Sequence, residues 1–366
     1  MKSRHTHGEH RVAWRVSVPA GLAGFAAELA RRDYGKDRKT DEVLFDESSV
    51  TFGAPLNLSA PPPWASAAAV VIAATEHRPN LETAAGGFTR SLSHPETETG
   101  AKTLAAIVAL SARNGTRTQT FALRSFLEGS PAALDPAARG RLEEAIRAIT
   151  GLRPDSRSPA FEFQLALRAD HSAALLWNRF PSQTGRGEAG ALPSSTARLL
   201  VELSQPQAGD IFLDPFCGSG AIPLERARLP YKMIFAGDRE EAEVARVKAV
   251  LAEPRMAKRR KTIFPKVLDA RDLSRFEDAF FTAIVTDPPW GRHEKLDDAT
   301  LEELYGRFLA EAARTLAPGG RLVLLCGRSG PIADGTISID TDFETDARYE
   351  VLVSGQKALV LCLVRR

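Results

Sequence analysis

The stretch Ile211–Glu225, which reads IFLDPFCGSGAIPLE, decides the fold of this chain. Its first residues, Ile211–Leu213, form a short apolar run that predicts a buried strand. A turn with two glycines follows, and the residues from Ala221 onward predict the start of a helix. A strand, a glycine-containing turn and a helix N-terminus together predict a place where a small nucleoside-bearing ligand binds. Glycine suits such a turn because it has no Cβ to block the approach of the ligand.

A second stretch, about seventy residues later, predicts where the chemistry takes place. The apolar residues Ala283–Thr286 predict another buried strand, and the sequence DPPWG follows at residues 287–291. Proline cannot donate to a sheet, so the strand must stop there. The carboxylate of Asp287 and the carbonyl of Pro288 then offer two acceptors for the exocyclic amine of a base, and Trp290 can stack on that base. The alternative is a turn that contains a buried tryptophan.

Strands and helices alternate from Ser194 to the end of the chain. The pattern predicts strands at 211–213, 233–237, 266–268, 282–286 and 321–326, with helices at 221–228, 240–252 and 298–316. This alternation predicts an α/β fold with a parallel, doubly wound sheet. Two final strands, 348–353 and 357–364, have a connection so short that they must be antiparallel. A parallel sheet that ends in such a hairpin is typical of a class I (Rossmann-like) methyltransferase domain, which we expect over residues 194–366.

Two smaller α+β units are expected before this domain, over residues 1–82 and 83–172. In the second unit, Gly86-Gly87 predicts a loop and residues 100–113 predict a helix. The order of helices and strands suits a small RNA-binding domain, although a dimerisation or scaffold domain fits the pattern as well. The chain is rich in Gly, Ser and Thr from Pro181 to Pro193, which predicts a linker or a lid, and we place the linker over residues 173–193.

The composition indicates a soluble globular protein with ordinary charge. The chain has 366 residues, 43% hydrophobic residues, 26% charged residues and a formal net charge of +2. It has no apolar run of the roughly 18 residues that a membrane span needs, and its first residues do not resemble a secretory signal. The three cysteines lack the spacing of metal ligands and are odd in number, so we expect no metal site and a cytoplasmic location.

Two further aspartates are candidates for binding a nucleoside cofactor. Asp238 ends the strand after the glycine turn, where a carboxylate would accept hydrogen bonds from both ribose hydroxyls. A helix cap is the alternative for this residue. Asp269 ends the next strand, where it would accept from an adenine amino group, and an ordinary loop aspartate is the alternative.

Both stretches resemble a known family. The sequence DPFCGSG followed by IPLE, within residues 214–225, looks like the first motif of the THUMP-associated RNA guanine-N2 methyltransferases, and DPPWG resembles their fourth motif. The resemblance covers about Leu192–Gly327. It is weaker upstream, where two segments resemble THUMP strands and the unit before them is similar to the family's ferredoxin-like domain. Two residues depart from the pattern: Trp290 replaces the usual Phe or Tyr, and Arg239 stands where an apolar residue commonly packs on adenine.

The resemblance implies an enzyme that uses S-adenosylmethionine to methylate the exocyclic N2 of guanosine in structured RNA, with tRNA as the expected substrate. It implies that the cofactor is bound by Asp214, Phe216, Gly218, Ser219, Gly220, Asp238, Arg239, Asp269 and Ala270. The implied catalytic residues are Asp287, Pro288 and Trp290, and the implied substrate contacts are Pro289, Arg292 and His293. Three alternatives stay open: N6-adenine methylation of RNA or DNA, methylation of a glutamine amide, and an RNA-binding protein without catalysis.

One dense basic cluster comprises Arg255, Lys258, Arg259, Arg260, Lys261 and Lys266. It lies between the second expected helix of the sheet domain and the next strand. A solvated helix end is the default interpretation of such a cluster. The alternative is a track for the phosphates of an RNA backbone.

Overall fold

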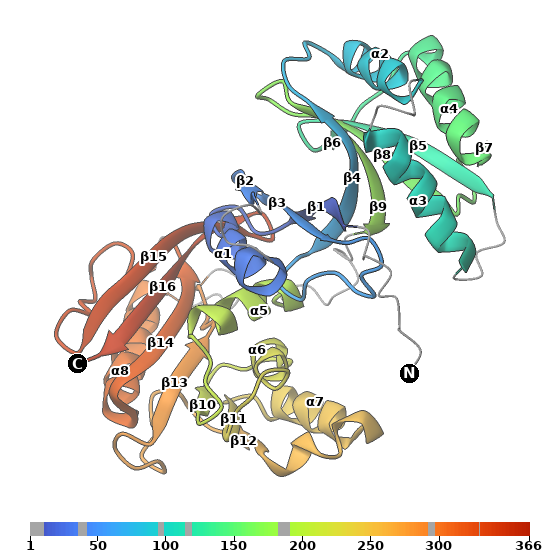
Figure 1. Ribbon diagram of the computed structural model, residues 1–366. Coiled ribbons are helices and arrows are strands. Elements are labelled where there is room, and N and C mark those ends of the chain that lie inside the picture. The colour runs from blue at the N-terminus through green and yellow to red at the C-terminus, as the bar shows by residue number, and fades with distance from the viewer. Residues whose placement is uncertain are drawn as a thin grey trace. The chain divides into compact units, whose positions relative to one another are not determined.

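The computed structural model describes residues 11–35, 42–93, 99–113, 119–181, 191–291, 297–328 and 330–366 (Figure 1). The chain divides into two compact units. Unit 1 comprises residues 1–17 and 27–182, and unit 2 comprises residues 18–26 and 183–366.

Unit 1 is built on one mixed sheet. Over its described residues the sheet has nine strands in the order β2-β3-β1-β4-β9-β8-β5-β6, with β7 paired to β5. The strands are β1 (Arg11–Ser17), β2 (Leu44–Phe45), β3 (Ser49–Pro55), β4 (Ala67–Thr75), β5 (Thr120–Leu127), β6 (Ser130–Pro131), β7 (Arg153–Pro154), β8 (Phe161–Leu167) and β9 (Ala173–Phe180). The helices before β9 are α1 (Ala23–Tyr34), α2 (Leu81–Leu92), α3 (Thr99–Arg113) and α4 (Pro136–Thr150).

The expected loop at Gly86-Gly87 is wrong, because both glycines lie inside α2. The helix begins with a capping box in which the Asn80 side chain accepts from the backbone N–H of Thr83 at 2.9 Å. Its buried face consists of Leu81, Ala84, Ala85, Phe88 and Leu92. Packing of this face outweighs the cost of about 1 kcal/mol for each glycine in a helix.

The expected linker is also wrong over residues 173–180, which form β9. This strand pairs antiparallel with β4 on one side and with β8 on the other. Its residues Ala173–Trp177 are all buried, so it lacks the alternation that marks a strand with one solvated face. Residues 182–190 of the expected linker lie outside the described residues. The division of the N-terminal region into 1–82 and 83–172 stays a prediction, and β9 joins strands from both parts in one sheet.

Unit 2 contains a seven-stranded sheet in the order β12-β11-β10-β13-β14-β16-β15, counted over its described residues. The strands are β10 (Ile211–Asp214), β11 (Met233–Asp238), β12 (Ile263–Val267), β13 (Phe281–Thr286), β14 (Leu316–Gly327), β15 (Phe343–Val353) and β16 (Gln356–Arg365). The helices are α5 (Ser194–Leu203), α6 (Ala221–Arg226), α7 (Glu241–Ala252) and α8 (Asp298–Thr315), with short 3₁₀ turns η1 (Pro254–Met256) and η2 (Arg259–Lys261).

The strand pairing confirms the expected doubly wound α/β sheet with a terminal hairpin. The first five strands in the sheet order are parallel, whereas β16 pairs antiparallel with β14 and with β15. β12 begins earlier than predicted, at Ile263, and includes Pro265. Proline is tolerated there because β12 is an edge strand and needs a partner on one side only.

Both faces of the sheet in unit 2 are covered. On one face, Leu213 of β10 and Ile284 of β13 pack in a core cluster with α8. On the other, Phe212 lies under the guanidinium of Arg226, which belongs to α6 and is fully buried. Arg226 is paired with Asp210 at 2.9 Å, and Asp210 also accepts from Thr282 of β13. The near-continuous apolar runs of β10 and β13 reflect this burial on two sides.

The described residues include no helix long and apolar enough to span a bilayer. The same part of the chain holds no group of three or more His, Cys, Asp or Glu side chains arranged for a metal ion. Cys217, Cys326 and Cys362 are buried and unpaired.

Candidate active site

A cavity of about 670 Å³ lies in unit 2 at the carboxyl ends of β10, β11 and β13. The strand order changes direction at β10, which has β11 on one side and β13 on the other. Ligands of parallel α/β sheets bind at such a switch point, outside the carboxyl ends of the strands. The predicted site residues that line the cavity are Phe216, Gly218, Asp238, Arg239, Asp269, Ala270, Asp287, Pro288, Pro289 and Trp290.

Five predicted site residues are not among those that line this cavity. Asp214, Ser219 and Gly220 lie in the glycine turn or just before it but do not contribute to the wall. Arg292 and His293 lie outside the described residues, so their roles stay predictions.

The two glycines of the turn have different reasons to be glycine. Both have positive φ values, 48° for Gly218 and 94° for Gly220, which favour glycine over other residues. A Cβ on Gly218 would meet nothing within 4 Å, so this position faces open space at the cavity. A Cβ on Gly220 would lie 2.9 Å from the Cγ2 of Val247 in α7. Gly220 is therefore required for helix packing, and its expected role in making room for a ligand stays a prediction.

Asp214 points into the interior rather than into the cavity. Its Oδ1 accepts from Thr286 Oγ1 at 2.6 Å and from the backbone N–H of Phe216 at 3.2 Å, so the carboxyl group joins β10 to β13 and to the turn. Its Oδ2 is buried and has no hydrogen-bond partner among the described residues. Burial raises the pKa of Asp214 to about 8, and the nearby charges of Asp238 and Asp287 act in the same direction.

Asp238 shapes the glycine turn as well as the cavity wall. One carboxylate oxygen accepts from the backbone N–H of Gly218 at 2.9 Å, and the other accepts from the backbone N–H of Glu240 at 2.9 Å. Each carboxylate oxygen has a second lone pair, so Asp238 retains acceptor capacity toward the cavity. The helix-cap alternative is wrong, because Glu240 is the N-cap of α7 and Asp238 bonds to the backbone N–H of that residue before the helix begins. Binding of a ligand by Asp238 stays a prediction.

The carboxylate of Asp269 forms hydrogen bonds with Arg271, a residue that was not predicted to belong to the site. Arg271 donates to both of its carboxylate oxygens, at 3.0 Å from Nε to Oδ1 and at 2.6 Å from Nη2 to Oδ2. These hydrogen bonds lower the pKa of Asp269. An adenine amino group at this place would share its acceptor with Arg271. The backbone N–H of Ala270 receives no hydrogen-bond acceptor from the described residues and also lies at the cavity.

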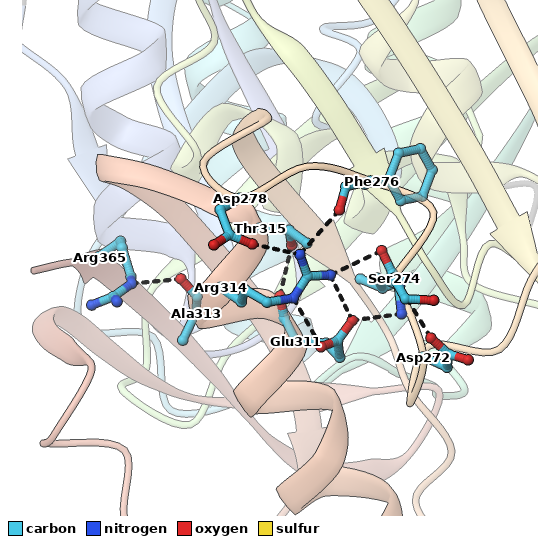
Figure 2. Close-up of polar contacts among 10 residues, drawn as sticks. Asp272, Ser274, Phe276, Asp278, Glu311, Ala313, Arg314, Thr315 and Arg365 are labelled. Atoms are coloured by element: carbon cyan, nitrogen blue, oxygen red, sulfur yellow. Dashed lines mark hydrogen bonds and ion pairs between the residues drawn. The ribbon is translucent and has the colours of Figure 1, made fainter.

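The loop that follows Asp269–Arg271 is fixed to α8 by Arg314 (Figure 2). The Arg314 guanidinium donates to the carbonyls of Phe276 at 3.0 Å and Leu273 at 2.9 Å, and it pairs with Asp278 at 2.7 Å. It also pairs with Glu311 on its own helix, and Glu311 accepts from the backbone N–H of Leu273 at 2.6 Å.

Asp287 and Trp290 are connected in the second stretch. The indole Nε1 of Trp290 donates to Asp287 Oδ1 at 2.9 Å. Tyr305 of α8 donates to the carbonyl of Pro289 at 3.1 Å, which fixes the turn from the other side. No described residue donates to the carbonyl of Pro288. A Cβ on Gly327 would lie 3.3 Å from the Cβ of Trp290, so the glycine lets the tryptophan approach the end of β14.

Part of the cavity wall consists of residues that were not predicted from the sequence. The missed residues are Ala191, Leu192, Pro193, Pro215, Glu240, Glu243, Leu268, Arg271, Leu304, Val353, Ser354 and Gln356. Val353, Ser354 and Gln356 belong to the turn between β15 and β16, which the sequence located as a hairpin without assigning it to the site. The position of Arg271 two residues after Asp269 was the available signal for that contact.

Comparison with known proteins agrees with this architecture. Residues 183–330 match the UPF0020 family, described as RMKL-like, methyltransferase domain. A tRNA (guanine(6)-N2)-methyltransferase of Thermus thermophilus is 30% identical over 215 residues, which are 56% of this chain and 62% of that protein. A tRNA (guanine(10)-N2)-dimethyltransferase of Methanothermobacter thermautotrophicus is 32% identical over 186 residues, which are 48% of this chain and 50% of that protein. The matched regions thus span between half and two thirds of these curated relatives.

Solved structures show the same fold over nearly the whole chain. TrmN from Thermus thermophilus matches with a TM-score of 0.72 and 23% identity, covering 98% of this chain and 100% of that chain. SMU.472, a putative methyltransferase complexed with SAH, matches with a TM-score of 0.63 and 14% identity, covering 96% of this chain and 97% of that chain. Together with the strand order and the family match, these likenesses confirm the expected fold. Residues 183–330 are thus similar to the RMKL-like methyltransferase domain of the UPF0020 family, and the sheet of unit 2 has a class I Rossmann-like fold.

Proposed function

We propose that this chain transfers a methyl group from S-adenosylmethionine to the exocyclic N2 of a guanosine in tRNA. One observation carries the proposal: Asp287 and Pro288, at the end of β13, share a cavity with Asp238 and Asp269, at the ends of the two strands beyond β10. One side of that cavity suits a nucleoside cofactor, and the other offers acceptors for an amine. The two curated relatives, which are named as tRNA guanine-N2 methyltransferases, support the choice of substrate.

The cavity residues fit S-adenosylmethionine. Gly218 leaves open space at the turn, Asp238 retains acceptor capacity for ribose hydroxyls, and the Ala270 N–H and Asp269 offer a donor and an acceptor for adenine. The charges of Asp238 and Asp287 both act on the pKa of the buried Asp214, so the two carboxylates lie near it at this end of the sheet. A cation bound in the cavity would be attracted to the carboxylates of Asp238 and Asp287, which line it. When bound, the cofactor supplies an electrophilic methyl group on a sulfonium.

The remaining work falls to the chain's own residues. The guanine N2 lone pair is delocalised into the ring, so it attacks only when its hydrogens are held. We assign the Asp287 carboxylate and the Pro288 carbonyl as the two acceptors that hold them. On accepting the methyl group that the cofactor would supply, N2 would release one proton, and Asp287 is placed to accept that proton. Alignment of the reacting atoms contributes most of the acceleration.

Trp290 would stack on a base taken out of its helix. Its hydrogen bond to Asp287 fixes the indole relative to the carboxylate, and Gly327 gives it room beside β14. The ring and the amine acceptors are thus held as one rigid group. We assign to unit 1 a share in binding parts of the tRNA other than the methylated base. The free, buried cysteines support a reducing compartment such as the cytoplasm.

The test is methylation of tRNA by the purified chain with labelled cofactor, followed by identification of the methylated nucleoside. We expect N2-methylated guanosine. Asp287→Asn should reduce the single-turnover rate by about 10²–10⁴-fold, the usual range for a positioned acid–base group, with little change in cofactor affinity. Asp272→Asn, an exposed aspartate outside the cavity, is the matched control and should keep the normal rate. Label on adenine N6 or in DNA would contradict the proposal.

A further inference from the structure

The basic cluster between α7 and β12 has no role in the proposed site. Four of its members are adjacent in the sequence. Lys258, Arg259, Arg260 and Lys261 are consecutive, exposed and without an ion-pair partner in the described part of the chain. Several arginines elsewhere in unit 2, namely Arg239, Arg271, Arg307, Arg314 and Arg321, each form an ion pair, whereas the described residues show none for Arg275 or Arg348. Figure 2 shows how completely Arg314 is engaged. We call residues 258–261 the basic turn.

The backbone of the basic turn is fixed, although its side chains are exposed. Thr262 N–H donates to the carbonyl of Arg259 at 3.0 Å, and the Thr262 hydroxyl lies 3.1 Å from Tyr231 Oη. The carbonyl of Thr262 accepts from the backbone N–H of Ile234 of β11 at 2.9 Å, and Met256, the last residue of η1, is buried. Residues three apart share a face in a 3₁₀ turn, so Lys258 and Lys261 extend from the same side. A fixed backbone reduces the entropy lost when these cations bind a partner.

The basic turn lies at the edge of the sheet opposite the cavity. Thr262 bonds to Ile234 at the amino end of β11, whereas Asp238 at the carboxyl end of that strand lines the cavity. Four residues of strand separate these positions, which corresponds to about 13 Å. A ligand that fills the cavity does not reach the basic turn unless it is a macromolecule.

Four adjacent cations without acids repel one another, so they disfavour the folded state unless a polyanion binds to them. We propose that the basic turn is an RNA-backbone contact of unit 2, which binds phosphates of the substrate tRNA at a distance from the methylated base. This inference rests on the proposed RNA substrate. Because the turn is remote from the reacting atoms, it contributes to affinity and to the salt dependence of binding but leaves the chemical step unchanged.

The test compares two charge-matched double variants of the full chain. Arg259→Gln/Arg260→Gln removes two cations of the basic turn, and Arg275→Gln/Arg307→Gln removes two exposed arginines of unit 2 outside the turn and the cavity. Binding to unfractionated tRNA is measured over a range of salt concentrations. Each lost phosphate contact lowers the slope of log Kd against log salt by about 0.7–0.9. We expect the first variant to lose about 1.5 in slope and about tenfold in affinity near 0.1 M salt, and the control to match the wild type.

Three further measurements make the result specific. Arg259→Lys/Arg260→Lys keeps the charge and should restore most of the affinity. Cofactor affinity and the single-turnover rate at saturating tRNA should be unchanged in every variant, which also shows that the chain is folded. Equal tRNA binding by the two Gln variants overturns the inference, as does binding of duplex DNA or phosphatidylglycerol vesicles, rather than tRNA, that depends on the turn. The two proposals can fail separately, because binding is measured without turnover. If tRNA binding depends on the basic turn but the chain methylates no guanosine, only the proposed reaction is refuted.

Discussion

The contacts of Arg314 allow the connection between α8 and the loop at residues 272–279 to be tested in isolation. Its guanidinium donates to the carbonyls of Leu273 and Phe276 at 2.9 and 3.0 Å, and it pairs with Asp278. Hydrogen bonds from a charged donor contribute about 1.5–3 kcal/mol each, and the lower value suits a side chain that is 30% exposed. The exposed pair with Asp278 adds at most about 1 kcal/mol. Arg314→Gln should therefore make opening of the loop easier by about 3 kcal/mol.

Hydrogen–deuterium exchange of the full chain measures this opening directly. A change of 3 kcal/mol corresponds to about 100-fold faster exchange, confined to backbone amides of residues 272–279. The matched control is Arg307→Gln on the same helix, whose pair with Glu303 is exposed and separated by 3.6 Å. An i,i+4 pair of this kind contributes about 0.3–0.5 kcal/mol, so exchange in the loop should not change. Less than fivefold acceleration in the Arg314 variant would show that Glu311, through Leu273 N–H, holds the loop without the arginine.

Two further predictions concern the cavity wall. Gly237→Ala places a Cβ 2.5 Å from the side chain of Leu268, which lines the cavity. This overpacking should lower the free energy of unfolding by about 1–3 kcal/mol and weaken S-adenosylmethionine binding in calorimetry. The control Gly306→Ala, whose Cβ would meet nothing within 4 Å, should have neither effect. The pKa of Asp214 is raised by burial from 3.8 to about 8, so its contribution to stability is complete below about pH 4 and is lost as the pH rises through about 8. Urea midpoints of the wild type should therefore fall relative to Asp214→Asn between about pH 4 and 8, and parallel pH profiles would refute the buried carboxyl.

The fold of unit 2 was predictable because its signals are local. The apolar runs at Phe212-Leu213 and Ala283–Val285 mark strands without reference to the rest of the chain. The short turn before Gln356 leaves no choice but an antiparallel hairpin. Strand β9 and helix α2 were missed for the opposite reason. Their residues violate local preferences, and only tertiary packing on both sides of the sheet or along one helix face decides the outcome.

The site residues that follow directly after predicted strands could be predicted from the sequence. Asp238 and Asp287 follow apolar runs directly, so their place at the carboxyl edge of a parallel sheet follows from sequence. The direction in which the Asp214 side chain points does not follow from sequence, because the last residue of a strand can face the interior or the ligand. The hydrogen bond from the Thr286 hydroxyl turns this side chain to the interior. The position of Ser354 in the cavity wall could not be predicted, because it depends on the pairing of β16 with β14, which are distant in the sequence.

The hydrogen bond from Trp290 to Asp287 also turns the site into its own optical probe. The chain has four tryptophans, and the other three, Trp14, Trp64 and Trp177, are buried in unit 1. Trp290 is thus the single indole of unit 2, partly exposed and bonded to a carboxylate at the cavity. Any ligand that changes the electric field or the water around that indole changes its emission. Filling of the cavity can therefore be followed by intrinsic fluorescence in rapid mixing, without a label, against a constant background from unit 1.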